Sequence, residues 1–294
     1  MSPWIGVLRL WSLTASTVPV TAGAALAAYE GSFSWPLLLL CLLSGWLLQV
    51  AANLLNTYGD HRSGVDTAHR PPTAPQLVNG ALRPRSVLRA GLTVLALGAA
   101  VGLAAVAFSD ARLLLFAAAG VAAAGFYTTG LRLKYAGLGL PLVMVAMGIL
   151  MVMASHFAQA RALSPAAVWV SLPVACLVGA VLHGNDLRDR VGDRHAGILT
   201  SSLLIGPRGA RWLFVTLHTL PYLLLARCVT ARQLPLWTLL PLLAFPLSVA
   251  VARDCLRGEA RSLEGRSAGI HFVFGTLLTL GLVLAHILRE SPAP

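Results

Sequence analysis

Two short polar motifs interrupt an otherwise apolar sequence, and each places oxygen-bearing side chains at positions i, i+3 and i+7. The first motif is Asn53, Asn56 and Asp60, and the second motif is Asp186, Asp189 and Asp193. An α-helix of about 3.6 residues per turn puts side chains at this spacing on one face. Carboxylate and carboxamide oxygens are hard ligands that suit Mg²⁺, and Mg²⁺ commonly holds phosphates. The spacing therefore predicts a magnesium site that handles a diphosphate.

The segments beside the motifs add further charged groups. After the first motif, Gly64 permits a turn that brings Asp66 back toward Asp60. The second motif interleaves its carboxylates with Arg188 and Arg194, as a site for a metal-bound polyanion requires. Five of the eleven acidic residues of the chain fall in these two regions, so the scarce negative charge is concentrated at two places.

Each of these residues also has a purely structural interpretation. A single carboxylate at a helix end can cap the helix or pair with a nearby arginine. Asn53 and Gln49, which lie one helical turn apart, can serve as hydrogen-bonding contacts between helices. The recurrence of one spacing in two motifs favours a shared site over isolated caps.

The elements that must carry these motifs are membrane-spanning helices. Of 294 residues, 57% are hydrophobic and 11% are charged, and the mean hydropathy is +0.75. A soluble domain of this size is less apolar. A segment of roughly 17 to 25 residues crosses a hydrocarbon core of about 30 Å. We predict an all-α polytopic membrane bundle, one domain over residues 1–294, with nine helices near 10–28, 35–55, 87–108, 112–130, 139–159, 166–184, 211–227, 234–252 and 269–288.

The basic residues predict the orientation of this bundle in the cell membrane. Of the 22 lysine and arginine residues, 17 fall on the side that carries both motifs and 5 fall on the other side. Basic loops stay in the cytoplasm, so we expect a cytoplasmic N-terminus, cytoplasmic motif loops and an external C-terminus. The net charge of +11 does not indicate a nucleic-acid partner. Arginines spread over short loops beside apolar helices contact the headgroups of the lipid bilayer instead.

The two motifs and a third segment resemble a known family. The quoted segments are Asn53-Leu-Leu-Asn56-Thr-Tyr-Gly-Asp60-His-Arg-Ser-Gly-Val-Asp66, Tyr127-Thr-Thr-Gly-Leu-Arg132-Leu-Lys134-Tyr135 and Asn185-Asp186-Leu-Arg188-Asp189-Arg-Val-Gly-Asp193-Arg194. Together with nine helices they resemble the UbiA superfamily of intramembrane prenyltransferases. Within it, the chain is most similar to the 1,4-dihydroxy-2-naphthoate prenyltransferases of menaquinone synthesis.

The resemblance implies a Mg²⁺-dependent transfer of an isoprenyl group from a prenyl diphosphate to an aromatic acceptor. The metal ligands that it implies are Asn56, Asp60, Asp66, Asp186, Asp189 and Asp193. The catalytic residues that it implies are Asp60, Asp66, Asp189, Asp193, Arg132 and Lys134. The substrate-binding residues that it implies are Asn53, Asn56, Tyr58, Arg70, Tyr127, Tyr135, Asn185, Arg188 and Arg194.

Three positions depart from the family pattern and keep other functions open. The chain has Thr57 and Leu140 where the family usually has acidic residues, and Ile198 where it has a lysine. A terpene cyclase on the same scaffold would also ionise a prenyl diphosphate, but the chain's own double bonds would capture the cation. A transporter is the third alternative. Its charged groups usually lie near the bilayer midplane, whereas these acids lie at helix ends.

Overall fold

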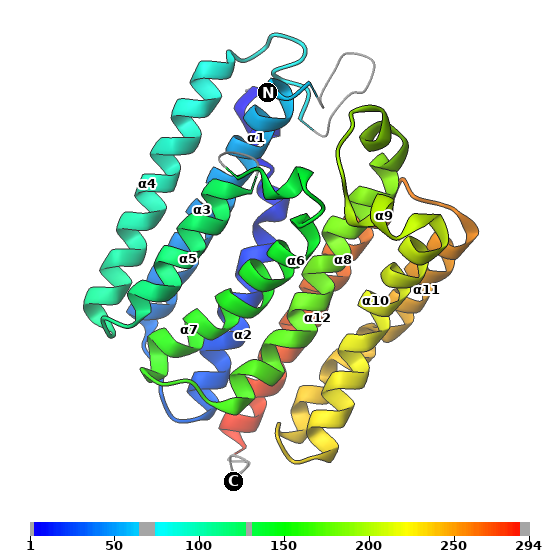
Figure 1. The fold of residues 1–294 in the computed structure, drawn as a ribbon. Helices are drawn as coiled ribbons and strands as arrows, with labels where there is room; N and C mark the ends of the chain where they lie inside the picture. Colours follow the sequence, from blue (N-terminus) through cyan, green and yellow to red (C-terminus); the bar gives the residue numbers. More distant parts are fainter. Residues whose placement is uncertain (1–2, 65–73, 128–130, 289–294) are drawn as a thin grey trace.

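The computed structural model describes residues 3–64, 74–127 and 131–288, and these residues form a bundle of helices (Figure 1). The first half contains α1 (Pro3–Leu8), η1 (Leu10–Leu13), α2 (Thr14–Tyr29), α3 (Trp35–Arg62), α4 (Pro84–Phe108), α5 (Leu113–Phe126), η2 (Leu133–Tyr135), α6 (Gly139–Val143), η3 (Met144–Leu150) and α7 (Met151–Ala160). The second half contains α8 (Pro165–His195), α9 (Ser201–Leu204), α10 (Gly206–Thr230), η4 (Leu236–Ala244), α11 (Phe245–Arg257) and α12 (Leu263–Ile287). This architecture confirms the all-α prediction.

Within the described ranges, eight helical segments are long and apolar enough to cross a membrane. Three of them combine consecutive elements, over Pro3–Tyr29, Gly139–Ala160 and Leu236–Arg257. The span expected over 112–130 is shorter than predicted, because α5 has 14 residues and a length of about 21 Å at 1.5 Å per residue. Each of the nine predicted segments thus has a helical counterpart, and one of these is too short to cross the hydrocarbon core unaided.

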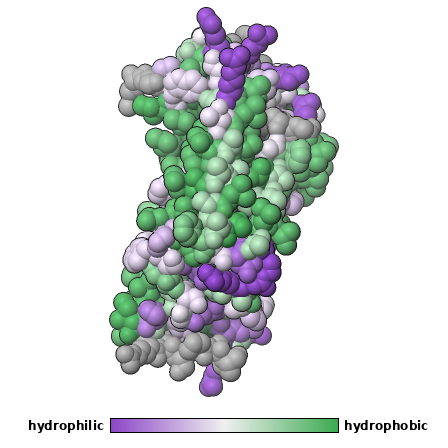
Figure 2. Space-filling model, turned by 90° about the vertical axis from the view of Figure 1, so that its left-hand side faces the viewer, coloured by the Kyte–Doolittle hydropathy of each residue, from purple (hydrophilic) through white to green (hydrophobic). Residues whose placement is uncertain are grey.

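The ends of the chain lie at opposite ends of the bundle (Figure 1). Helix α1 starts at the same end as η2 and α9, whereas α12 finishes at the other end. The side of the molecule seen in Figure 2 is mostly hydrophobic along its middle, with hydrophilic side chains toward both ends. This distribution matches a multi-pass membrane protein, in which the apolar belt contacts lipid.

Proline and serine residues mark several helix starts. Pro36, Pro84, Pro165 and Pro207 each lie in the first two positions of a helix, where the missing N–H of proline costs no hydrogen bond. At the start of α8, the Ser164 side chain accepts a hydrogen bond from the Ala167 N–H. These local signals fix where the long helices begin.

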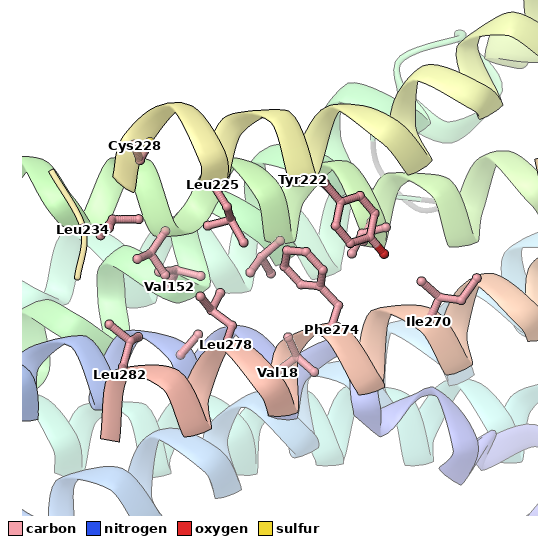
Figure 3. Packing of buried hydrophobic residues seen from close by; sticks show 14 of the residues in the cluster. Val18, Val152, Tyr222, Leu225, Cys228, Leu234, Ile270, Phe274, Leu278 and Leu282 are labelled. Carbon is pink, nitrogen blue, oxygen red and sulfur yellow. The ribbon is translucent and has the colours of Figure 1, made fainter. Parts of the chain in front are cut away.

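The main core lies between α2, α8, α10 and α12 (Figure 3). Phe274 of α12 meets the Tyr222 ring of α10 edge to face, with centroids 5.4 Å apart, and Val18 of α2 lies beside it (Figure 3). In lipid, helices associate through close packing of this kind, because lipid tails are as apolar as the side chains. The core therefore holds α2 and α12 together along their length.

The π-helical segment η3 approaches α8 very closely. A Cβ atom added at Gly148 would lie 2.2 Å from the Cα atom of Ala175, so glycine is needed for the two backbones to meet. π-Helical turns occur often at functional sites. Here Ala146, Met147 and Leu150 of η3 line a cavity of about 310 Å³.

A candidate active site at one end of the bundle

The first motif converges on one ammonium group. The Lys134 Nζ donates to Asp60 Oδ1 at 2.9 Å, to Asp60 Oδ2 at 2.8 Å and to Asn56 Oδ1 at 3.0 Å. The exposed fraction of the Asp60 side chain is 8%, and that of the Lys134 side chain is 16%. Since Asn56 and Asp60 contact the same cation, these two members of the motif present their oxygens on one face of α3.

Tyr135 is the second partner of Asp60. Its hydroxyl donates to Asp60 Oδ1 at 2.6 Å and accepts a bond from the Ser63 Oγ at 3.4 Å. Burial, followed by the charge of Asp60 and by this hydrogen bond, raises the pKa of Tyr135 far above its ordinary value. The phenol therefore stays protonated and remains a donor. Arg132 supports the ring from outside, with its Cζ 4.9 Å from the ring centroid.

In the second motif, Arg188 joins α8 to α12. Its guanidinium donates to both carboxylate oxygens of Asp189, at 3.0 and 2.9 Å, and also to Asn185 and to Glu264 of α12. Bidentate pairing of this type fixes the geometry of both partners. The carboxylate of Asp189 is thus held against a cation from its own helix.

Asp186 and Asp193 are buried beside this pair. The Ser201 Oγ donates to Asp186 Oδ2 at 3.0 Å, and the Ser202 Oγ donates to the main-chain oxygen of Asp186 at 3.0 Å. These bonds tie the short helix α9 to the last turns of α8. Polar groups this deep are stable because each has a partner.

The two motifs meet through the segment around η2. The Leu199 N–H donates to the Tyr135 carbonyl at 3.2 Å, which joins the loop after α8 to η2. Lys134, which binds Asp60, also interacts electrostatically with Asp186. Tyr127 experiences the negative charges of both Asp186 and Asp60. The structure therefore brings the three polar segments of the sequence to one end of the bundle.

Asn53 faces the N-terminal helices. Its Nδ2 donates to the Leu8 carbonyl at 3.0 Å and to the Ser12 Oγ at 2.9 Å. Sequence reasoning overlooked Arg9, whose Nη2 lies 3.5 Å from the Thr57 Oγ1, and it overlooked Glu264. Arg9 had a usable signal, because it is a lone cation within an apolar segment.

The remaining predicted residues lie farther from this centre or outside the described ranges. Tyr58 packs against the cluster around Val7 and Leu54, and Arg132 and Arg194 are exposed. Asp66 and Arg70 lie outside the described residues. Their predicted roles as ligand and substrate contact therefore stay predictions.

A cavity of about 310 Å³ extends from this centre into the bundle. Polar side chains at its motif end belong to Arg9, Asn53, Asn56, Tyr127, Lys134 and Asn185. Deeper walls come from apolar residues such as Leu113, Phe116, Met147 and Leu150. A cavity with charged groups at one end and hydrocarbon walls beyond them suits an amphipathic ligand with a polar head and an apolar chain.

The three departures from the family pattern are all buried. Thr57 donates to the Asn53 carbonyl at 2.9 Å. Leu140 packs in the cluster with Cys176 and Leu217, and the exposed fraction of Ile198 is 7%. At each position the side chain fills protein interior. Beside Thr57, the Nη2 of Arg9 lies 3.5 Å from the Thr57 Oγ1, and the Nε of Arg9 is buried without a hydrogen-bond partner.

The first motif offers oxygen atoms of the kind that suits Mg²⁺, and in this structure they bind an ammonium group. Three oxygen atoms from Asn56 and Asp60 already surround the Lys134 ammonium at 2.8–3.0 Å, and hard oxygens of this kind suit Mg²⁺. Within the ranges that the structure describes, no group of three or more His, Cys, Asp or Glu side chains is arranged to hold a metal. Asp189 is paired with Arg188 instead.

Comparison with known proteins gives a consistent family. The description "UbiA prenyltransferase family" matches residues 16–285. UbiA prenyltransferase domain-containing protein 1 of Gallus gallus is 33% identical over 286 residues, which cover 96% of this chain and 85% of that protein. The 1,4-dihydroxy-2-naphthoate octaprenyltransferase of Bacillus subtilis (strain 168) is 29% identical over 283 residues, covering 95% of this chain and 91% of that protein.

Solved structures share the fold. An apo UbiA homolog from Aeropyrum pernix K1 superposes with a TM-score of 0.73 at 21% identity, covering 94% of this chain and 98% of that one. A UbiA homolog from Archaeoglobus fulgidus bound to GPP and Mg²⁺ superposes with a TM-score of 0.67 at 16% identity, covering 96% and 100%. At these identities the likeness establishes the arrangement of helices.

Proposed function

The chain belongs to the UbiA prenyltransferase family and is a multi-pass membrane prenyltransferase, and from that premise we propose that it transfers an isoprenyl group from a prenyl diphosphate to an aromatic acceptor. One observation carries the proposal. Asn56 and Lys134, which is bound to Asp60, line the charged end of a cavity whose deeper walls are largely apolar. The Bacillus subtilis relative acts on 1,4-dihydroxy-2-naphthoate by its name, which supports an aromatic acceptor of the naphthoate type.

Mg²⁺ is the metal that we propose for this reaction. A bound Mg²⁺ would neutralise the diphosphate and stabilise its departure. The residues proposed to hold it are Asn56, Asp60, Asp66, Asp186, Asp189 and Asp193. Support comes from the oxygens that surround Lys134 and from the archaeal homolog that binds GPP and Mg²⁺.

Cationic side chains at the polar end would bind the diphosphate oxygens. Lys134 and Arg9 line the cavity there, and Arg188 lies beside Asn185 on the cavity wall. The negative charge on the diphosphate grows as the allylic C–O bond breaks. These positive groups therefore stabilise the transition state more than the bound substrate, which lowers the activation barrier. Lys134 then has a second role, since it holds Asp60 in place when no diphosphate is bound.

The apolar part of the cavity would hold the prenyl chain and keep water from the allylic cation. Leu113, Phe116 and Met147 form hydrocarbon walls, and exclusion of water prevents premature hydrolysis. The Tyr127 ring, which lies on the same cavity, is suited to stabilise a nearby cation through its face. The acceptor ring would then attack the cation to form the new C–C bond. The diphosphate keeps the electron pair of the broken C–O bond, and the attacked ring carbon loses its proton, which restores the aromatic ring and completes the transfer.

The test is product analysis with purified full-length protein in lipid. Prenyl diphosphates of several lengths are incubated with hydroxynaphthoates and other aromatic acceptors, with Mg²⁺ or with a chelator. We expect a product whose mass equals acceptor plus prenyl group minus one hydrogen, formed in the presence of Mg²⁺ and lost with the chelator. Cyclised hydrocarbons without an acceptor adduct would identify a terpene cyclase instead.

We also propose that the motif end of the bundle faces the cytoplasm. The unequal division of the basic residues, 17 against 5, supports this orientation through the positive-inside rule. It places the charged substrate head on the side where prenyl diphosphates are dissolved or delivered. The N-terminus would lie inside and the C-terminus outside.

A further inference from the structure

The depth of the cavity can be measured along two of the helices that line it. On α3 the lining residues run from Asn56 at the motif end to Cys41. On α5 they run from Tyr127 to Leu113, and the lining is continuous between these ends through Phe116, Ala117, Gly120, Ala123 and Ala124. At 1.5 Å per residue, both stretches are about 21–23 Å long. The cavity therefore extends for about 20 Å from the polar groups at the motif end.

At its far end the cavity meets a packed apolar cluster. Its buried members, and the partly buried side chains that pack against them, come from α3, α4, α5 and α7, and they include Cys41, Ala105, Leu113, Phe116, Ala154, Phe157 and Ala158. These four helices contact one another (Figure 1). Ala105, Leu113 and Phe116 also line the cavity, so this cluster is the floor of the cavity.

Aromatic stacking and a charged cap support the floor from outside. The rings of Phe116 and Phe157 stack with centroids 5.6 Å apart, and the Arg112 Cζ lies 5.4 Å from the centroid of the Phe157 ring. The Arg112 guanidinium also donates to both carboxylate oxygens of Asp110 and to the Arg161 carbonyl. A hydrocarbon chain that passed the floor would meet these charged groups, so the apolar path ends here.

This depth corresponds to a prenyl chain of limited length. Each isoprene unit adds four bonds of about 1.5 Å, and an extended chain advances by about 5 Å per unit. A path of about 20 Å therefore holds about four units between the diphosphate and the floor. The octaprenyl group in the name of the Bacillus subtilis relative would be about twice as long as this path.

We infer that Leu113 and Phe116, supported by Phe157, limit the prenyl donor to about four isoprene units. This inference rests on the proposed use of a prenyl diphosphate. A longer chain must either overfill the packed floor, which is unfavourable, or hold its diphosphate away from the cations at the motif end, which loses charge-assisted contacts. The floor thus acts as a specificity determinant far from the reacting atoms.

The direct test measures the binding of unreactive donors to the purified full-length protein in lipid nanodiscs with Mg²⁺. The probes are prenyl thiolodiphosphates with three, four, five or eight isoprene units, in which sulfur replaces the bridging oxygen so that the chain is not released. Dissociation constants are expressed per lipid, because the probes partition into the bilayer to different extents. We expect the wild type to bind the four-unit probe at least as tightly as the three-unit probe, and the two longer probes about tenfold more weakly or worse.

Variants of Phe116 test the floor itself. Phe116→Ala removes a ring of about the size of one isoprene unit, so the five-unit probe should gain about tenfold or more relative to the four-unit probe. Phe116→Trp fills more of the far end and should shift the preference to the three-unit probe. Each result is a ratio between probes within one variant, so a partial loss of folded protein does not change it.

Phe126→Ala is the matched control on the same helix. The exposed fraction of Phe126 is 45%, and the cavity-lining residues on either side of it are Ala124 and Tyr127. This variant should keep the wild-type ratios. Equal binding of the four- and eight-unit probes by the wild type would overturn the inference, because the longer chain would then leave the cavity between helices. Unchanged ratios in Phe116→Ala, or a wild type that binds no probe of any length, would overturn it as well.

Product analysis with reactive donors separates this inference from the proposed function. If prenyl transfer occurs, kcat/KM for the donor should fall by about tenfold or more beyond four units, and Phe116→Ala should restore the five-unit donor. Transfer of all lengths with equal kcat/KM would remove the floor as a determinant and leave the function standing. Length-dependent binding that Phe116→Ala relaxes, without any prenylated acceptor, would refute the function alone.

Discussion

At the scale of single residues, Asp60 joins side chains from two segments of the site. It accepts hydrogen bonds from both Lys134 and Tyr135, and it lies one helical turn from Asn56. A carboxylate that contacts a cation, a phenol and a proposed metal ion contributes both to substrate binding and to the rate of the reaction. Replacement of such a group usually costs far more than the loss of one contact.

The first prediction is that Asp60→Asn lowers Mg²⁺-dependent diphosphate release by at least about a hundredfold. The amide keeps the shape but removes the charge that pairs with Lys134. The matched control is Asp110→Asn, because Asp110 pairs with Arg112 at the opposite end of the bundle. Release of diphosphate is measured in proteoliposomes. Normal turnover by Asp60→Asn would remove Asp60 from the site.

The second prediction concerns Ile198, where the family usually has a lysine. Since the Ile198 side chain is buried, we expect Ile198→Lys to bury an ammonium or displace the loop after α8, at a cost of about 1–3 kcal/mol. The neighbouring Leu199 is 50% exposed, so Leu199→Lys is the control and should have little effect. The measurement is the melting temperature of each variant, and we expect that of Ile198→Lys to be lower than that of Leu199→Lys. Equal melting temperatures would show that position 198 can accept a lysine without strain.

At the scale of elements, the site depends on how η3 and α8 pack. The close approach of Gly148 to Ala175 sets the position of the cavity wall formed by η3. It also fixes the position of α8 at Ala175. Helices in membranes rely on small residues for such approaches. The active site therefore depends on a contact between helices well away from its charged groups.

The third prediction is that Gly148→Ala destabilises the protein by about 1–3 kcal/mol, because the added methyl overlaps the α8 backbone. Gly269→Ala on α12 is the control, since nothing lies within 4 Å of a Cβ atom there. Thermal unfolding in detergent should separate the two variants. A melting temperature for Gly148→Ala as high as that of the control would mean that η3 can move away from α8 freely.

At the scale of the whole molecule, the described residues contain eight helical segments long enough to cross a membrane and the shorter helix α5. Helix α1 begins at one end of the bundle and α12 finishes at the other (Figure 1). An odd number of crossings follows if the short helix α5 completes its crossing. The number of crossings therefore depends on α5. The distribution of arginine residues predicts that the motif end is cytoplasmic.

The fourth prediction is that a reporter fused after Pro294 is active outside the cytoplasm, whereas a reporter fused to the N-terminus is active inside. The physical reason is the cost of moving the arginine-rich motif loops across the membrane. The side of the membrane on which each terminus lies is measured with two reporters. One reporter is active only outside the cytoplasm, and the other is active only inside it. Both ends on the same side would require an even number of crossings.

The sequence by itself determined the class of the protein, because hydrophobicity and length are properties of composition and need no tertiary contact. Helical spacing also predicted Asn56 and Asp60 on one face as candidate site residues, and the family resemblance added Lys134, which the structure places in contact with both. The contact between Lys134 and Asp60 spans 74 residues of sequence, and no local pattern specifies it. Glu264 escaped detection for the same reason, whereas Arg9, in the turn between α1 and η1, had a usable signal as a lone cation in an apolar segment.

Only the tertiary structure decided which polar groups have partners. The pairing of Arg188 with Asp189 and Glu264 depends on the packing of α12 against α8. The unpaired state of Ser16 and His271 depends on a cavity that several helices enclose. Periodicity along one helix gives the direction of a side chain but not the identity of what faces it, and that identity is set by contacts between helices far apart in the chain.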